Sequence, residues 1–210
     1  MSHALADVLH HPAAWRQATS GMAHVRTRST GRAELDAQLP GGGWPQGALS
    51  EMLSEHDGLG DFNLALPALK ALTREGRRVV LINPPYVPYA PALRAAGVDL
   101  RQLNQLAAEG PEAVWTMEQC LRSGGCGAVI AWIGQLDYRS LRRLQLAAES
   151  GDSLALLFRP AAEAAHNSPA GLRLHVCAEH GHTRVDVLKS RGRFQHHAVT
   201  PLPRGHLLSN

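Results

Sequence analysis

The sequence predicts an α/β fold: a mostly parallel sheet flanked by helices, with a C-terminal antiparallel hairpin. The apolar, β-branched runs RRVVLIN (77–83) and GAVIAWI (127–133) are typical of parallel strands buried on both faces. Helical segments that end at glycine alternate with these runs, as in strand–helix–strand units. From Leu172 onward, LRLHVCA and RVDVLKS alternate apolar and polar residues on either side of a glycine-containing turn. That pattern favours a hairpin at the edge of the sheet.

The other elements follow from periodicity and from the positions of proline and glycine. Residues 40–47 contain too much of both for a helix or a central strand. We expect, in order, a short helix within 4–18, a strand at 48–53, a helix at 64–76 with Pro67 in its first turn, helices at 91–100, 111–124 and 137–151, and a buried strand at 153–159. We divide the chain into an N-terminal helical segment (1–24), an α/β domain (25–188) and a basic, flexible C-terminal tail (189–210).

Composition places the chain among globular proteins of modest charge. It has 210 residues, of which 44% are hydrophobic and 19% charged, and a net charge of +3, which alone does not argue for nucleic-acid binding. No apolar stretch approaches the roughly 20 residues of a membrane helix, and the first residues lack the pattern of a secretory signal. Cys120, Cys126 and Cys177 form no CxxC motif. We therefore expect a cytoplasmic protein without disulfides or a bound metal.

Several segments between about Val25 and Phe158 resemble the RecA family core, and they occur in the same order. TRSTGRAELDAQLPGGGWPQGALSEML resembles the strand that leads into the phosphate loop, and SEHDGLGDFNLAL stands in the position of that loop. REGRRVVLINPPYVPYAPALRAAGVDL, MEQCLRSGGCGAVIAWIGQL and LRRLQLAAESGDSLALLFR resemble the following strands and helices, with the Walker B strand in the second. The resemblance implies a RecA-like core.

The residues that bind phosphate in a working loop are replaced. Such a loop has the form GxxxxGK[ST], in which lysine reaches the phosphates and Ser or Thr binds magnesium. Gly58 and Gly60 are retained, but Asp61 stands in the place of lysine and Phe62 in that of Ser or Thr. An anionic side chain at this position repels phosphate, and Phe62 cannot bind a metal ion.

Three further positions of the RecA pattern also differ. Trp132 occupies the place of the Walker B aspartate, and the sequence NPPY (83–86) replaces the segment with the catalytic glutamate. Arg159 stands where active members have the glutamine that couples nucleotide to DNA binding. We expect no ATP hydrolysis, no catalytic residues and no nucleotide cofactor, and we expect Trp132 to fill the space of the missing site.

Within RecA-like proteins, LPGGGWPQGALSEML, INPPYVPYAPALRAAGVDL and LRRLQLAAE resemble the ImuA family. That resemblance implies a non-catalytic adaptor of SOS-induced translesion DNA synthesis. Its expected partners are an ImuB-like polymerase homologue, RecA and an error-prone DnaE-type polymerase. The ImuA family is similar in turn to SulA. The alternative is therefore a SulA-like inhibitor that binds the division GTPase FtsZ, although the segments at both ends exceed a SulA-type core.

Two groups of residues are candidates for partner binding. Tyr86 and Tyr89 lie in a proline-stiffened loop after a strand; they either anchor an interface or pack over the vacated nucleotide site. Arg139, Arg142 and Arg143 have helical spacing. These arginines either contact an acidic surface or phosphate of a partner, or form a solvated face paired with Asp137 or Glu149.

Basic residues near the C-terminus and a tryptophan near the N-terminus complete the set of candidates. Lys189, Arg191 and Arg193 are expected beyond the hairpin on a mobile edge, where they contact either solvent or nucleic acid. Trp15 belongs to the expected N-terminal helix and packs either on this chain or on a partner.

Overall fold

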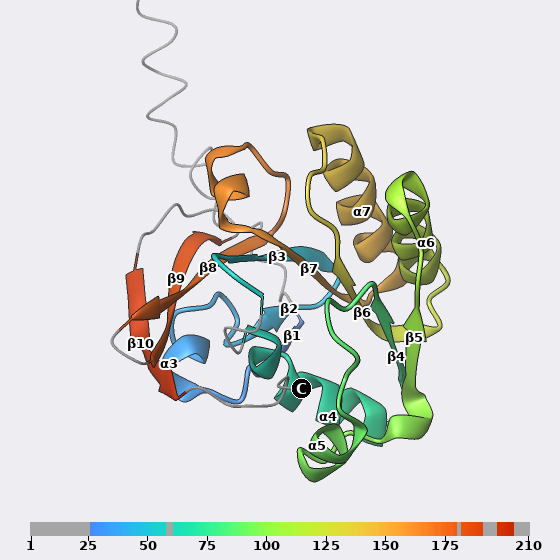
Figure 1. Cartoon of the computed structure of the whole chain (residues 1–210), viewed down its shortest axis with the longest axis horizontal. Helices are drawn as coiled ribbons and strands as arrows, with labels where there is room; N and C mark the ends of the chain where they lie inside the picture. Colours follow the sequence, from blue (N-terminus) through green and yellow to red (C-terminus); the bar gives the residue numbers. More distant parts are fainter. Residues whose placement is uncertain (1–25, 58–60, 180–181, 191–196, 204–210) are drawn as a thin grey trace, which may run out of the picture.

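The computed structural model describes residues 26–57, 61–179, 182–190 and 197–203 (Figure 1). Within them, an eight-stranded sheet has the order β10-β9-β8-β3-β7-β6-β4-β5. The strands are β3 (Ala48–Ser54), β4 (Arg78–Ile82), β5 (Leu103–Leu106), β6 (Cys126–Trp132), β7 (Leu154–Pro160), β8 (Leu172–Glu179), β9 (His182–Ser190) and β10 (His197–Pro203). β1 (Thr27–Arg28) and β2 (Trp44–Pro45) form a separate antiparallel pair.

Strand direction confirms the predicted fold class. The strands from β5 to β8 in the sheet order pair in parallel, whereas β8–β9 and β9–β10 are antiparallel. The chain crosses between parallel strands through helices, as predicted. These are α4 (Leu66–Arg74), α5 (Ala90–Ala95), α6 (Gly110–Arg122) and α7 (Tyr138–Gly151), and the short helix α3 (Ala33–Asp36) precedes them all. Pro67 lies in the first turn of α4, where its missing N–H costs no helical hydrogen bond.

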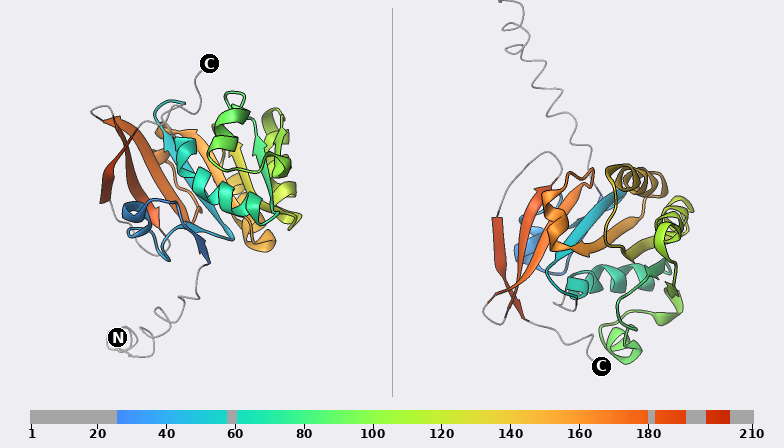
Figure 2. Two further views of the ribbon diagram at one scale, coloured as in Figure 1. Left: turned by 90° about the horizontal axis from the view of Figure 1, so that it is seen from below. Right: turned by 45° about the horizontal axis from the view of Figure 1, so that its top comes forward.

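Two apolar clusters hold the layers together. One joins α4 and α5 to one face of the sheet, and the other joins α6 and α7 to the opposite face. Figures 1 and 2 show these helix pairs on either side of the strands. Because both faces are covered, β3 is buried along its whole length. The strands β8 to β10, orange to red in Figure 2, lie at the side of the sheet away from α4 to α7.

The chain beyond Leu188 differs from the prediction of a tail. Lys189 lies within β9, and residues 197–203 form an additional strand, β10, which pairs with β9. Strand β5 was also not predicted. The expected helix within 4–18 lies outside the described residues. The RecA-like assignment and the proposed domain boundaries stay predictions.

Two further observations concern the described part of the chain. None of its helices is both long enough and apolar enough to cross a membrane. Cys120, Cys126 and Cys177 are free thiols, of which Cys120 is half-buried and the other two are buried.

Candidate functional site

A cleft of about 680 Å³ opens where β3, β4, β6 and β7 end. Its lining includes Ser54 at the end of β3 and Asp61 after it, Asn83 and Tyr86 after β4, and Trp132 at the end of β6. The carboxyl ends of parallel strands are where open α/β sheets bind their ligands. The structure thus brings Asp61, Tyr86 and Trp132 together from three separate stretches of sequence.

An aromatic stack occupies one side of this cleft. Trp132 stacks on Phe158 with ring centroids 4.8 Å apart and an interplanar angle of 18°, and it meets Phe62 at 5.7 Å and 51°. Phe62 and Phe158 are buried, whereas Trp132 is half-buried and contacts both the core and the cleft. Stacked and tilted pairs at these separations are favourable arrangements of aromatic rings. Trp132 therefore packs against the core and also lines the open cleft, and its role in filling the place of a nucleotide site stays a prediction.

Asp61 is buried at the start of the 3-10 helix η1 (Asp61–Leu64). The Ser54 hydroxyl donates to its Oδ2 at 2.6 Å, and the backbone N–H of Phe62 donates to Oδ1 at 2.9 Å. Burial raises the pKa of the Asp61 carboxyl, while these two hydrogen bonds act in the opposite direction. Its carboxylate is thus committed to the fold. Gly58 and Gly60 lie outside the described residues.

Asn83 fixes the beginning of the segment that carries the candidate tyrosines. Its Nδ2 donates to the Ala108 carbonyl at 2.6 Å, and the Ala108 N–H donates to its Oδ1 at 2.9 Å. The residue has a φ of 52°, a left-handed conformation that Asn tolerates better than most residues. This clamp joins the end of β4 to the segment before α6.

The 84–89 loop, which follows this clamp, presents apolar side chains to solvent. Tyr86, Val87 and Tyr89 are 50%, 84% and 60% exposed. Tyr86 lines the cleft, and Tyr89 is the N-cap residue of α5. Both tyrosines are therefore accessible to a partner, and Tyr86 also forms part of the cleft wall.

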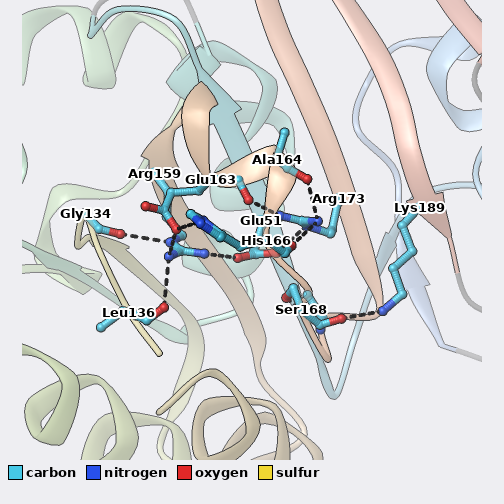
Figure 3. A network of polar contacts seen from close by, with 11 residues as sticks. Glu51, Gly134, Leu136, Arg159, Glu163, Ala164, His166, Ser168, Arg173 and Lys189 are labelled. Carbon is cyan, nitrogen blue, oxygen red and sulfur yellow. Dashed lines mark hydrogen bonds and ion pairs between the residues drawn. The ribbon is translucent and has the colours of Figure 1, made fainter. Parts of the chain in front are cut away.

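A buried ionic network lies beside the cleft and was not predicted (Figure 3). Arg159 donates from Nη1 to Glu51 Oε1 at 2.7 Å, from Nη2 to Glu163 Oε2 at 2.6 Å, and from Nε to the Gly134 carbonyl at 2.9 Å. Arg173 Nε forms an ion pair with Glu51 Oε2 at 2.7 Å, although the angle there is not that of a hydrogen bond. The network ties β3, β7, β8 and the 3-10 helix η3 (Ala161–Ala165) together.

Arg159 thus has a structural role at the position where the RecA pattern has glutamine. Its side chain is 1% exposed, and its guanidinium is already bonded on several sides. The signal in the sequence was a charged residue inside a mostly apolar strand, in both ALSEMLS (48–54) and LALLFRP (154–160).

The candidate arginines of α7 lie away from the cleft's lining residues. Arg139 and Arg142 are exposed and form no ion pair with any described residue, whereas Arg143 pairs with Glu118 of α6. The two interpretations of these arginines, a partner contact or a solvated face near Asp137, stay predictions. Asp137 caps α7 by accepting the Ser140 N–H at 2.8 Å. Hydrogen bonding to Ser140 lowers the pKa of its carboxyl, and the charges of Arg139 and Arg143 add to this effect.

The predicted mobile position of Lys189 is also wrong. Its Nζ donates to the Ser168 carbonyl at 2.7 Å, which holds the side chain partly buried (Figure 3). Burial lowers the pKa of the Lys189 ammonium, and the neighbouring charge of Arg173 adds to this effect. Arg191, Arg193 and Trp15 lie outside the described residues.

Comparison with known proteins identifies relatives of the segment that forms this cleft. The family model described as cell division inhibitor SulA matches residues 47–155, just over half of the chain. SulA of Edwardsiella piscicida is 37% identical over 95 residues, which are 45% of this chain and 56% of that protein. SulA of Citrobacter koseri (strain ATCC BAA-895 / CDC 4225-83 / SGSC4696) is 26% identical over 162 residues, which are 75% of this chain and 96% of that protein.

Two other matches complete the comparison. Protein RecA of Chlorobaculum parvum (strain DSM 263 / NCIMB 8327) is 31% identical over 112 residues, covering 53% of this chain and 32% of RecA. The crystal structure of SulA from Pseudomonas aeruginosa has a TM-score of 0.45 and 27% identity to this chain. The match covers 53% of this chain and 97% of that structure. The family model extends from the turn before β3 to the second residue of β7, and so includes β3, β4 and β6, whose carboxyl ends line the cleft. By this match, the chain belongs to the SulA family.

Proposed function

We propose that this protein inhibits cell division by binding the GTPase FtsZ and that it catalyses no reaction. The observation that carries this proposal is the match of residues 47–155 to a family described as cell division inhibitors. We favour this partner over the mutasome partners expected from the ImuA resemblance, because two of the three curated relatives reported above are named as division inhibitors. FtsZ is cytoplasmic, so a cytoplasmic location belongs to the same proposal.

The chemistry of the cleft supports a role without nucleotide turnover. Asp61, which stands where a phosphate loop has lysine, is buried and bonded to Ser54. We expect the ring of Trp132, which stacks on Phe158, to take the place of the Walker B carboxylate that orients magnesium. Asp61 and Phe62 supply neither the lysine nor the hydroxyl with which a phosphate loop stabilises a transferring phosphoryl group.

The 84–89 loop is the surface that we assign to the partner. Exposed aromatic side chains are the commonest anchors of protein interfaces, and they contribute most when their backbone is already ordered. The three prolines of PPYVPY and the Asn83–Ala108 clamp restrict this backbone before binding. Tyr86 is therefore expected to be the main contact, with the exposed Val87 beside it.

Binding and inhibition are tested on the full chain with purified FtsZ. We expect the unaltered chain to retain FtsZ in a pull-down and to slow its GTP-dependent assembly, measured by light scattering. The double variant Tyr86→Ser/Val87→Ser should weaken binding by about 10-fold or more, since anchor residues typically contribute at least this much. Leu146→Ser is the matched control, because Leu146 is also an exposed apolar residue, on α7.

The same pull-down also tests the mutasome partners. An ImuB-like protein, RecA and a DnaE-type polymerase are each incubated with the chain in parallel with FtsZ, with and without single-stranded DNA. Retention of the ImuB-like protein or RecA without FtsZ would overturn the proposal. Equal loss of FtsZ binding in the loop variant and in Leu146→Ser would contradict the assignment of the surface but not of the partner.

A further inference from the structure

Three side chains with metal-ligand chemistry meet on one face of the β8–β9 hairpin. His175 and Cys177 are two residues apart on β8 and therefore share a face of the strand. Asp186 of β9 is in register with His175. A ring nitrogen of His175, the Cys177 sulfur and a carboxylate oxygen of Asp186 all lie within 4.8 Å of one another. Strand pairing thus collects the set, which explains why local spacing along the chain did not reveal it.

We propose that His175, Cys177 and Asp186 bind one divalent ion of the zinc class. Thiolate and imidazole ligands favour zinc and its neighbours over magnesium and calcium, which prefer oxygen ligands alone. His175 Nδ1 lies 3.7 Å from Oδ2 of Asp186, so the imidazole and the carboxylate group are close enough to share one ion. Three protein ligands leave the fourth position of that tetrahedron for water or another ligand.

The surroundings of Asp186 are compatible with an ion at this place. Arg184 donates to Asp186 Oδ2 from Nε at 3.2 Å and from Nη2 at 3.0 Å. The contacts of Asp186 with other described residues all use Oδ2, so Oδ1 is left for the ion. Arg184 then acts as an outer-shell partner that orients the carboxylate.

Charge and exposure fit the same assignment. A Cys177 thiolate and the Asp186 carboxylate together balance the two positive charges of the ion, while Arg184 also pairs with Glu179 at 3.1 Å. The side chains of His175 and Asp186 are 22% and 17% exposed, whereas Cys177 is buried. An ion can therefore approach from solvent, with the thiol on its protected side.

The test is a titration of the metal-free full chain with Co²⁺, which takes the place of zinc and reports its ligands by absorption. We expect one equivalent to produce a thiolate-to-cobalt charge-transfer band together with visible bands of a four-coordinate ion, and we expect Zn²⁺ to displace it. Cys177→Ser should abolish the charge-transfer band. Asp186→Asn and His175→Gln should each weaken binding by about 10-fold or more, the least that loss of even an outer-shell partner usually costs.

Cys120→Ser is the matched control, because Cys120 lies on α6, outside the hairpin. It should leave both the band and the affinity unchanged. Absence of a charge-transfer band in the unaltered chain would overturn the proposal, as would a band that survives in Cys177→Ser and disappears in Cys120→Ser. Circular dichroism shows whether each variant is folded. If Cys177→Ser does not fold, the cobalt affinities of Asp186→Asn and His175→Gln test the proposal instead.

Discussion

Arg159 and Glu51 form an ion pair of 2.7 Å in which the side chains are 1% and 0% exposed. The two residues are 108 positions apart in the sequence but are brought together by adjacent strands β3 and β7. Removing one member of such a pair leaves an uncompensated charge in the interior, which is more costly than the loss of an exposed pair.

We predict that Arg159→Met lowers the free energy of unfolding by about 3–5 kcal/mol, because Glu51 and Glu163 lose their common partner. Chemical denaturation followed by circular dichroism measures the change. Arg142→Met is the control, since Arg142 is exposed, and its effect should stay within about 0.5 kcal/mol. Equal stabilities of the two variants would show that the buried network does not stabilise the fold.

The strands that were predicted most directly are those that are buried, because burial requires a continuous run of apolar residues that can be recognised in the sequence. All of β6 except Trp132 is buried, and its run GAVIAWI was predicted as a strand. In contrast, β5 has the sequence LNQL at the sheet edge, where most of its residues are exposed and no apolar pattern is required. Strand β10 contains Pro201 and Pro203, and proline within a strand is tolerated mainly at an edge.

The candidate site was predicted in part for a related reason. Asp61, Tyr86 and Trp132 were selected because they depart from a known pattern or stand at a strand end, and the structure places all three at the cleft. The partners of Asn83 and Arg159 are set by tertiary contacts with Ala108 and Glu51. No local pattern encodes such contacts. The same limit applies to Lys189, whose position depends on the Ser168 carbonyl.

The clamp at Asn83 predicts different effects for two substitutions. Asn83→Gly loses both side-chain hydrogen bonds to Ala108 but tolerates the φ of 52°. Asn83→Ala loses the same bonds and also adopts a left-handed conformation that costs about 1–2 kcal/mol. We expect Ala to be less stable than Gly by about 1 kcal/mol, measured by urea denaturation. A more stable Ala variant would show that the backbone leaves this conformation when the clamp is lost.

Nucleotide hydrolysis should not return when the phosphate loop alone is restored. In Asp61→Lys/Phe62→Thr, the lysine and hydroxyl of a phosphate loop are present, but Trp132, which we align with the Walker B carboxylate, is unchanged. We expect no magnesium-dependent release of phosphate above that of the unaltered chain in a steady-state assay. Measurable turnover in the double variant would contradict our interpretation of these positions.

Close approach of α7 to α6 predicts that Gly151 is sensitive to substitution. A Cβ at Gly151 would lie 1.7 Å from the Leu121 carbonyl oxygen, so the backbone of one helix must move. Gly151→Ala should therefore lower the free energy of unfolding by about 1–3 kcal/mol or more. At Gly134 an added Cβ meets no atom within 4 Å, and Gly134→Ala is the control. A Gly151→Ala variant as stable as this control would contradict the close packing of the two helices.

Burial of Asp61 predicts a dependence of stability on pH at the cleft. Desolvation raises the pKa of its carboxyl above the ordinary value of 3.8, so the folded chain holds this proton more tightly than the unfolded chain. Below pH 3.8 the carboxyl is protonated in both states and imposes no penalty. As the pH rises from 3.8 through the raised pKa, the unfolded state gains by ionising first, and stability is lost.

Asp61→Asn removes this ionisation. Its single oxygen can accept from the Phe62 N–H, while its Nδ2 donates to the Ser54 hydroxyl. We therefore expect Asp61→Asn to exceed the unaltered chain in stability at neutral pH and to match it in acid, in denaturation measurements between about pH 3 and pH 7. Comparing the two chains at each pH cancels the contributions of the other carboxyls. A stability difference that is constant with pH would show that the Asp61 carboxyl titrates alike in both states. If the unaltered chain instead becomes more stable relative to the variant as the pH rises, the hydrogen bonds to Asp61 affect its pKa more strongly than burial does.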